Sequence, residues 1–205
     1  MRLTALYLRS RLAGYAALIV AAVAVLVWGA PYLQAAARTN AVLVPVLAPL
    51  ACACVVGAGA HSPFGEHERT AAYPLFGVRV AHLVGLIFWA GLLLVLGTSA
   101  AGEEPLRWEC ARNLGGLSGL AFLAARLVGG RLCWTAPVFY ATVAPFVVRG
   151  PDETWSWLAW VYRPGSDELS WVVALTLLTA GLVTVSLSQP WAGRGVGFGR
   201  DPGAS

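Results

Sequence analysis

A serine between glycines is the first candidate for catalytic chemistry in this chain. Ser118 lies in the string Gly116-Leu117-Ser118-Gly119, inside an apolar run. A serine becomes a nucleophile when a histidine within hydrogen-bond reach accepts its proton. The last apolar run contains no histidine. The histidines of the chain all lie at or near one end of the predicted helices, away from Ser118; they are His61, His67 and His82. The spacing therefore argues against serine hydrolysis.

The same string resembles the nucleophile motif of rhomboid intramembrane proteases, and the missing histidine base is the reason to reject that function. Small residues four positions apart let two membrane helices approach each other closely. Gly115 and Gly119 have this spacing, with Ser118 beside Gly119. We therefore expect Gly115, Ser118 and Gly119 to pack against a neighbouring helix, and we expect no catalytic residue on this chain.

Residues 61–79 form the longest polar interruption between two apolar runs, and they could dock a soluble partner. Their charges would set the register, and their apolar side chains would enter a groove on the partner. The alternative is a solvated loop followed by an ordinary interfacial helix. His61 and His67 lack a nearby third ligand, so we expect no metal site. The candidate docking residues are Glu66, His67, Glu68, Arg69, Tyr73, Phe76 and Arg79.

The composition is that of a polytopic membrane protein. The 205 residues are 58% apolar and 12% charged, with a mean hydropathy of +0.69, far from the soluble average. The chain contains no lysine, so all fourteen of its cationic side chains are arginine. A P-loop needs its lysine on the nucleotide phosphates, which excludes a Walker-type ATPase on this chain. The four cysteines contain no C-x-x-C pair, and we expect neither a disulfide nor a metal among them.

Hydropathy predicts an all-α membrane domain over residues 1–190 with six spans, followed by a flexible cytoplasmic tail at 191–205. An arginine-rich interfacial helix is expected at residues 1–11. The fourth span has only thirteen residues between Arg112 and Arg126, so both arginines are expected to snorkel to water. Pro45 and Pro49 predict a kink in the second span. The spans are expected at about 12–30, 41–60, 80–101, 110–128, 132–148 and 169–188.

Arginine counts orient the predicted spans. Nine arginines fall on the side of the N-terminus and five on the other side. The side richer in arginine faces the cytoplasm. Both termini and residues 61–79 are therefore expected inside the cell, and the acidic loop with Glu103, Glu104 and Glu109 is expected outside.

Two further groups of residues have predicted roles. Residues 151–165 are crowded with tryptophan, which favours membrane interfaces, and they are expected to form an outer interfacial helix before the last span. Threonines give the last span a lightly polar character, either lining a substrate path or bonding to neighbouring helices; we favour packing. The expected anchors are Trp155, Trp157, Trp160 and Trp171, and the possible path-lining residues are Thr176, Thr179 and Thr184.

This layout resembles the permease subunits of ABC-2 type exporters, in a small actinobacterial form. The family has an N-terminal interfacial helix, six spans, a coupling helix between the second and third, and an interfacial element before the sixth. Here these would be residues 1–11, the six runs, 66–79 and 151–165. The string Glu68-Arg69-Thr70, continued by Pro74-Leu75, also resembles small actinobacterial membrane proteins of this kind.

The resemblance implies export through the bacterial plasma membrane, by motion rather than catalysis. A separate ABC ATPase would carry ATP and Mg²⁺ and grip residues 66–79, so no cofactor is expected on this chain. A second permease copy or paralogue and the lipid bilayer would be its other partners, and no nucleic acid is expected. The alternative from another class is a non-transporting membrane protein that serves as a structural or regulatory partner of another complex.

Overall fold

The computed structural model describes residues 19–23, 25, 44–60, 76–100, 104–148 and 153–187. All regular structure in these ranges is helical, which confirms the predicted all-α class. The interfacial helix expected at residues 1–11 and the tail expected at 191–205 lie outside the described residues. The longer elements are α3 (Val44–Gly59), α4 (Phe76–Ala100), α5 (Glu104–Leu127), α6 (Thr135–Val148) and α7 (Glu168–Leu187). Two 3-10 helices, η3 (Gly130–Leu132) and η4 (Glu153–Tyr162), precede α6 and α7 respectively.

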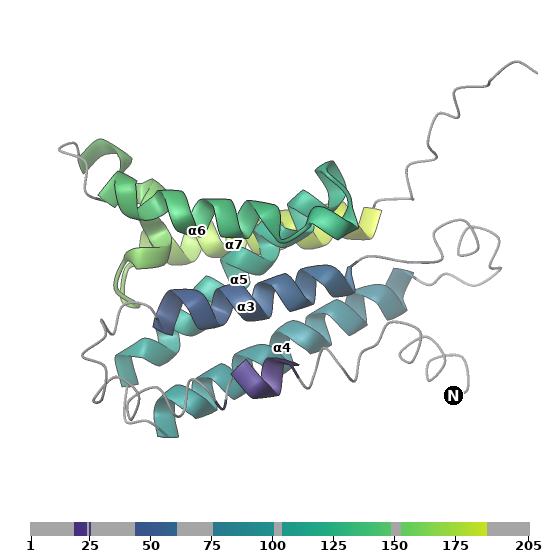
Figure 1. The fold of residues 1–205 in the computed structure, drawn as a ribbon, viewed down its shortest axis with the longest axis horizontal. Helices are drawn as coiled ribbons and strands as arrows, with labels where there is room; N and C mark the ends of the chain where they lie inside the picture. Colours follow the sequence, from purple (N-terminus) through teal and green to yellow (C-terminus); the bar gives the residue numbers. More distant parts are fainter. Residues whose placement is uncertain are drawn as a thin grey trace, which may run out of the picture.

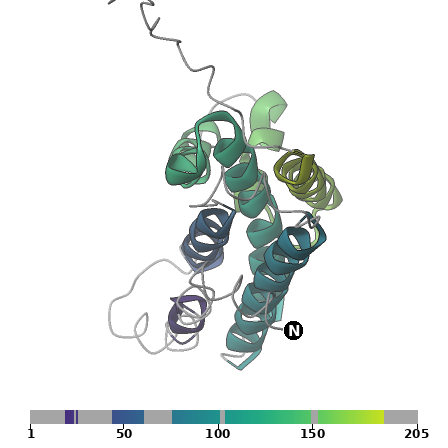
Figure 2. The same ribbon diagram turned by 90° about the vertical axis from the view of Figure 1, so that its right-hand side faces the viewer.

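Helix α5 is the centre of the bundle. It contacts α3, α4, α6 and α7, with the most extensive contact to α7. The views along and across the bundle show these helices running side by side, with α4 and α7 on different sides of α5 (Figures 1 and 2). The buried polar side chains Arg112, Asn113 and Ser118 all lie on this helix.

Three apolar clusters form the core, and α5 contributes to each. Cys110 and Leu114 belong to a cluster with α3 and α4, and Leu117 belongs to one with α3, α6, η4 and α7. Phe122 lies in the third cluster, against α3, α4 and α7. The buried face of α5 therefore changes partner along its length, which explains why this one helix organises the fold.

Among the described residues, two segments are long and apolar enough to cross a membrane. They are Val80–Ala100 in α4 and Glu168–Ser186 in α7. Only 28% and 22% of their most apolar windows are buried, whereas the core helix of a soluble protein is mostly buried. Large apolar side chains instead face outward on several helices, for example Phe88, Phe139 and Phe146, which are 70%, 69% and 74% exposed.

Two helices begin earlier than the predicted spans. Helix α4 begins at Phe76 rather than Val80, because no proline interrupts residues 76–79. Helix α5 begins at Glu104, so Glu104 and Glu109, which were expected in an acidic loop, belong to its first turns. Pro105 is compatible with this start because the first turn of a helix needs no donor from its backbone N–H.

The turn between α5 and α6 depends on one glycine. Gly129 has φ of 101°, in the left-handed region where a side chain would be strained. Leu132 N then donates to Gly129 O at 3.1 Å, which closes η3. The turn places Arg131 and Cys133 beside the C-terminal half of α3.

Candidate functional site

A buried polar centre lies in α5, within the predicted fourth span. Arg112 is 1% exposed and Asn113 is 0% exposed. The expectation that Arg112 snorkels to water is therefore wrong. Its guanidinium finds acceptors inside the protein instead, and these come from the segment that follows η4.

The guanidinium of Arg112 holds the C-terminal end of η4. Its Nη1 donates to Pro164 O at 2.8 Å, and its Nη2 donates to Arg163 O at 2.8 Å and to Val161 O at 3.4 Å. Carbonyls at the end of a helix have no partner within it, and leaving them unpaired away from water is costly. Arg112 thus supplies side-chain donors at the end of η4, where the backbone contributes the bond from Asp167 N to Pro164 O at 3.1 Å.

Asn113 links the same carbonyls to α3. Its Oδ1 accepts from Arg112 Nε at 3.2 Å and Nη2 at 3.1 Å, and its Nδ2 donates to Val161 O at 2.9 Å and to Pro45 O at 2.8 Å. In a regular helix Pro45 O would accept from residue 49, but Pro49 has no N–H. The proline pair therefore creates an orphan carbonyl, and Asn113 satisfies it.

A second set of polar contacts lies at the loop before α7. Gly165 N donates to Glu109 Oε1 at 3.2 Å, and Trp171 Nε1 donates to Gly165 O at 2.9 Å. Arg163 forms an ion pair with Asp167 at 3.2 Å. These contacts fix the loop on both sides of the polar centre.

Asp167 caps the N-terminus of α7. Its Oδ2 accepts from Ser170 N at 3.1 Å and also from Ser170 Oγ, the arrangement of an N-cap residue and its third helical residue. These bonds from Ser170 lower the pKa of the Asp167 carboxyl below its ordinary value of 3.8, and Arg163 lowers it further. Asp167 is therefore a carboxylate at neutral pH.

Aromatic residues attach η4 to α6. Trp160 is 3% exposed and stacks on Tyr140 with ring centroids 5.6 Å apart. Tyr140 Oη donates to Leu158 O, and Tyr162 Oη donates to Ala141 O at 3.0 Å. The Trp160 ring also fills the space beside Gly116, where a Cβ would come within 2.2 Å of it.

Helices α5 and α7 approach each other at glycines. A Cβ on Gly119 would lie 2.4 Å from the backbone C and O of Leu177, and a Cβ on Gly181 would lie 2.6 Å from Gly119 O. Gly115 is less confined, because the nearest atom to its Cβ position is Leu178 Cδ2 at 3.7 Å. Ser118 is 0% exposed, and its Oγ has no hydrogen-bond partner within the described residues.

The threonines singled out in the last span bond to their own helix. Thr176 Oγ1 donates to Val172 O at 2.7 Å, Thr179 Oγ1 donates to Leu175 O at 2.9 Å, and Thr184 Oγ1 donates to Gly181 O at 2.9 Å. Thr176 and Thr179 are exposed on α7. Among the described residues, neither donates to a neighbouring helix.

Several candidate residues lie outside the part of the chain that the structure describes. For the docking segment these are Glu66, His67, Glu68, Arg69 and Tyr73. Phe76 and Arg79 belong to the first turn of α4, and Trp155 and Trp157 belong to η4, but their side chains are outside the described part. Trp171 is described and is half-buried against Gly165.

The side chains of this centre bind other segments of the protein. The donors of Arg112 and Asn113 are directed at protein acceptors. Across the described ranges, no three His, Cys, Asp or Glu side chains gather as a metal site would require. All four cysteines are free.

Sequence reasoning missed Arg112 and Asn113, although two signals were present. The first is that Arg112 lies inside the predicted span 110–128, where ionisable side chains usually face the interior of a helix bundle. The spacing of Pro45 and Pro49, four residues apart, marks a carbonyl that needs an outside donor. Comparison of the chain with protein-family models, with curated proteins and with solved structures found no match.

Proposed function

We propose that this chain is the membrane-spanning permease subunit of an ABC-2 type exporter in a bacterial plasma membrane. In this proposal it crosses the membrane six times, with both termini in the cytoplasm, and pairs with a second copy or a paralogue. The ATP and Mg²⁺ belong to a separate ATPase. This chain contributes motion and a path and performs no catalysis.

The distribution of polarity supports the membrane location. The described helices expose large apolar side chains, while Arg112, Asn113, Ser118 and Ser170 are buried. In water such a surface would favour association or aggregation. In lipid the apolar surface is well solvated, and polar side chains are satisfied in the bundle interior.

The observation that carries the exporter proposal is the continuity of α4. The segment that resembles the coupling helix is residues 66–79, and its last four residues form the first turn of α4, which continues unbroken to Ala100. No proline interrupts this helix. A force applied to residues 76–79 would therefore move a rigid rod of 25 residues rather than a hinged loop.

The contacts of α4 suggest how such motion would spread. Along its length α4 packs on α5 and on α3. Helix α5 packs on α7 through glycines and binds the loop before α7 through Arg112. A tilt of α4 would therefore displace α5 and, with it, α7 and this loop. Coupling of this kind requires two conformational states of the bundle, whose populations depend both on the bound ATPase and on the transported substrate. ATP-driven closure of the ATPase would favour one of these states.

Purification of the full chain in mild detergent tests the proposal. We expect a Walker-motif ATPase to co-elute with the wild-type chain and to be lost when Glu66, Glu68 and Arg69 are all changed to alanine. Arg126→Ala is the matched control, since it removes an exposed arginine from the same predicted side of the membrane. Retention of the ATPase by the triple variant would contradict the role of residues 66–79.

A topology measurement tests the same proposal independently. A cysteine introduced at His67 should react with a membrane-impermeant maleimide only after the cell is opened. Labelling of intact cells at this position would place residues 61–79 outside and would exclude an ATPase as their partner.

One observation favours the alternative, a non-transporting partner of another membrane complex. Thr176, Thr179 and Thr184 donate to carbonyls of their own helix, and the polar centre is occupied by protein acceptors. A polar path is therefore absent from the described residues. If co-purification yields a sensor or a protease in place of an ATPase, this second function holds.

A further inference from the structure

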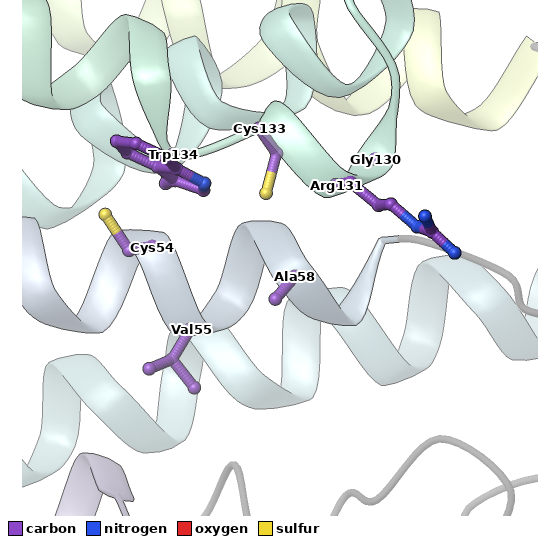
Figure 3. A pocket seen from close by; sticks show the side chains of 7 residues that line it. All are labelled: Cys54, Val55, Ala58, Gly130, Arg131, Cys133 and Trp134. Atoms are coloured by element: carbon purple, nitrogen blue, oxygen red, sulfur yellow. The ribbon is translucent and has the colours of Figure 1, made fainter.

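An apolar groove lies between α3 and the turn that leads into α6. Its volume is about 400 Å³, and its lining includes Cys54, Val55 and Ala58 of α3 together with Cys133 and Trp134. Figure 3 shows the two sulfur atoms and the Trp134 ring facing the space between these segments. Ala58 and Trp134 are exposed, so the groove is open at the outer surface of the bundle.

One arginine side chain, that of Arg131, lies at one end of this groove. Arg131 contributes to the lining, is exposed, and extends toward the C-terminal end of α3 (Figure 3). Within the described side chains, no acidic group pairs with Arg131. An apolar groove with an exposed guanidinium at one end matches an amphiphile with an anionic head and a hydrocarbon tail.

The described charges balance near the N-terminal ends of α5 and α7, because Arg107, Arg112 and Arg163 lie among the acidic side chains there. The acidic side chains that the structure describes are Glu109, Asp167 and Glu168, and they lie near the N-terminal ends of α5 and α7. Arg126 and Arg131 lie at the opposite end of α5, about 25 Å away at 1.5 Å per helical residue. Among the described side chains, the groove therefore opens at the end of the bundle that carries a net positive charge.

We propose that this groove binds an anionic phospholipid of the bilayer, with the phosphate at Arg131 and one acyl chain along α3. In the proposed membrane orientation, Trp134 precedes α6 at the cytoplasmic end of a span, where indole rings favour the headgroup region. Cationic side chains near the cytoplasmic leaflet attract anionic lipids. The proposal depends on the membrane location but not on export or on an ATPase.

The native cysteines allow the site to be tested. Cys54 lines the groove and is partly exposed, whereas Cys52 and Cys110 are buried. The full chain is incorporated into nanodiscs of phosphatidylcholine, with or without phosphatidylglycerol. Alkylation of Cys54 by N-ethylmaleimide is then followed by mass spectrometry of its peptide, and retained phosphatidylglycerol is counted by native mass spectrometry.

We expect phosphatidylglycerol to slow alkylation of Cys54 in the wild-type chain. Arg131→Gln should remove this protection and reduce phosphatidylglycerol retention about fivefold, the contribution of one cation close to an anionic lipid surface. Arg126→Gln is the matched control, because it removes an exposed arginine from the same end without touching the groove. Both positions are exposed, so both variants should fold, which intrinsic fluorescence melting verifies.

Three results would overturn the proposal. Equal protection of Cys54 in both lipid mixtures would mean that no anionic lipid occupies the groove. Equal effects of Arg126→Gln and Arg131→Gln would indicate a diffuse surface attraction rather than a site. Failure of the chain to enter nanodiscs of either composition would contradict its membrane location. Loss of ATPase co-elution alone would contradict the exporter proposal and leave the lipid-site proposal intact.

Discussion

Helix α5 is held to α7 and to the segment after η4 by two different kinds of contact. Against α7 it presents Gly119, and the backbones meet so closely that a Cβ there would fall 2.4 Å from Leu177 C and O. Against residues 161–164 it presents Arg112 and Asn113, which donate to backbone carbonyls. The first contact depends on the absence of a side chain, and the second depends on two specific ones.

The difference follows from what each neighbour offers. Helix α7 is regular, so its backbone groups are paired internally and only van der Waals contact remains to be gained. Val161 lies at the end of a 3-10 helix, and the residue three positions later is Pro164, which has no N–H. Pro45 is likewise followed four positions later by Pro49, so the carbonyls of Val161 and Pro45 both lack their usual backbone donor. In an apolar surrounding these carbonyls need donors from side chains, and α5 provides them.

The largest effect is expected from breaking the polar contact. Arg112→Ala removes the guanidinium donors to Arg163 O and Pro164 O, and only Asp167 N still donates to Pro164 O. The change should lower the free energy of unfolding by about 2–4 kcal/mol, because a buried polar group that loses its hydrogen-bond partner costs about 1–3 kcal/mol. Thermal unfolding in detergent, followed by the fluorescence of the nine tryptophans, measures the change.

Arg126→Ala provides the control for this variant, because it removes an exposed arginine from the same helix. Its unfolding temperature should stay close to that of the wild-type chain. Arg112→Lys should give an intermediate loss, since an ammonium keeps the charge but not the planar fork of donors. Equal melting of Arg112→Ala and Arg126→Ala would show that the polar centre contributes nothing to stability.

The glycine contact should give the next largest effect. Gly119→Ala forces a methyl group against the backbone of Leu177 and should destabilise the chain by about 1–3 kcal/mol, as for overpacking. Gly115→Ala is its matched control, because its methyl would meet only Leu178 Cδ2 at 3.7 Å. This control should be neutral or stabilising by up to about 1 kcal/mol through helix propensity. Equal destabilisation by both would contradict the close approach at Gly119.

The third largest effect is expected at the N-cap of α7, where two substitutions distinguish the loss of the charge from the loss of the hydrogen bond. Asp167→Ala removes the acceptor for Ser170 N and should cost about 1 kcal/mol, whereas Asp167→Asn keeps a cap and loses only the charge. The pKa of Asp167 is lowered in the folded chain by Ser170 and then Arg163. Its charge therefore contributes stability above its ordinary value of 3.8, and this contribution is lost as pH falls through the lower folded value.

Melting curves of the wild-type chain and Asp167→Asn across this pH range check the sign. The wild-type advantage should be present at neutral pH and should shrink in acid below pH 3.8. A wild-type advantage that grows in acid would mean that the carboxyl is stabilised in its protonated form.

The two contacts also differ in how far the sequence predicts them. Gly119 could be recognised because small residues at a spacing of four are a local pattern, and composition alone was enough for the all-α class. The role of Arg112 could not be recognised, because its acceptors lie about fifty residues later in the sequence and are available only where η4 ends. Residues 76–79 were predicted as part of a separate amphipathic helix, and their continuity with the span that follows was missed for a related reason, since hydropathy marks the apolar part of a helix and not its start.

The smallest effect is expected at Ser118, which lies between the two contacts on α5 and belongs to neither. Its buried hydroxyl has no partner within the described residues, so Ser118→Ala removes an unsatisfied polar group and should be neutral or slightly stabilising, within about 0.5 kcal/mol. Ser170→Ala is the matched control, because Ser170 is equally buried but bonds to Asp167, and it should lose about 1 kcal/mol. A marked loss of stability in Ser118→Ala alone would mean that Ser118 has a partner, such as a bound water, and that the polar centre extends one helical turn further toward α7.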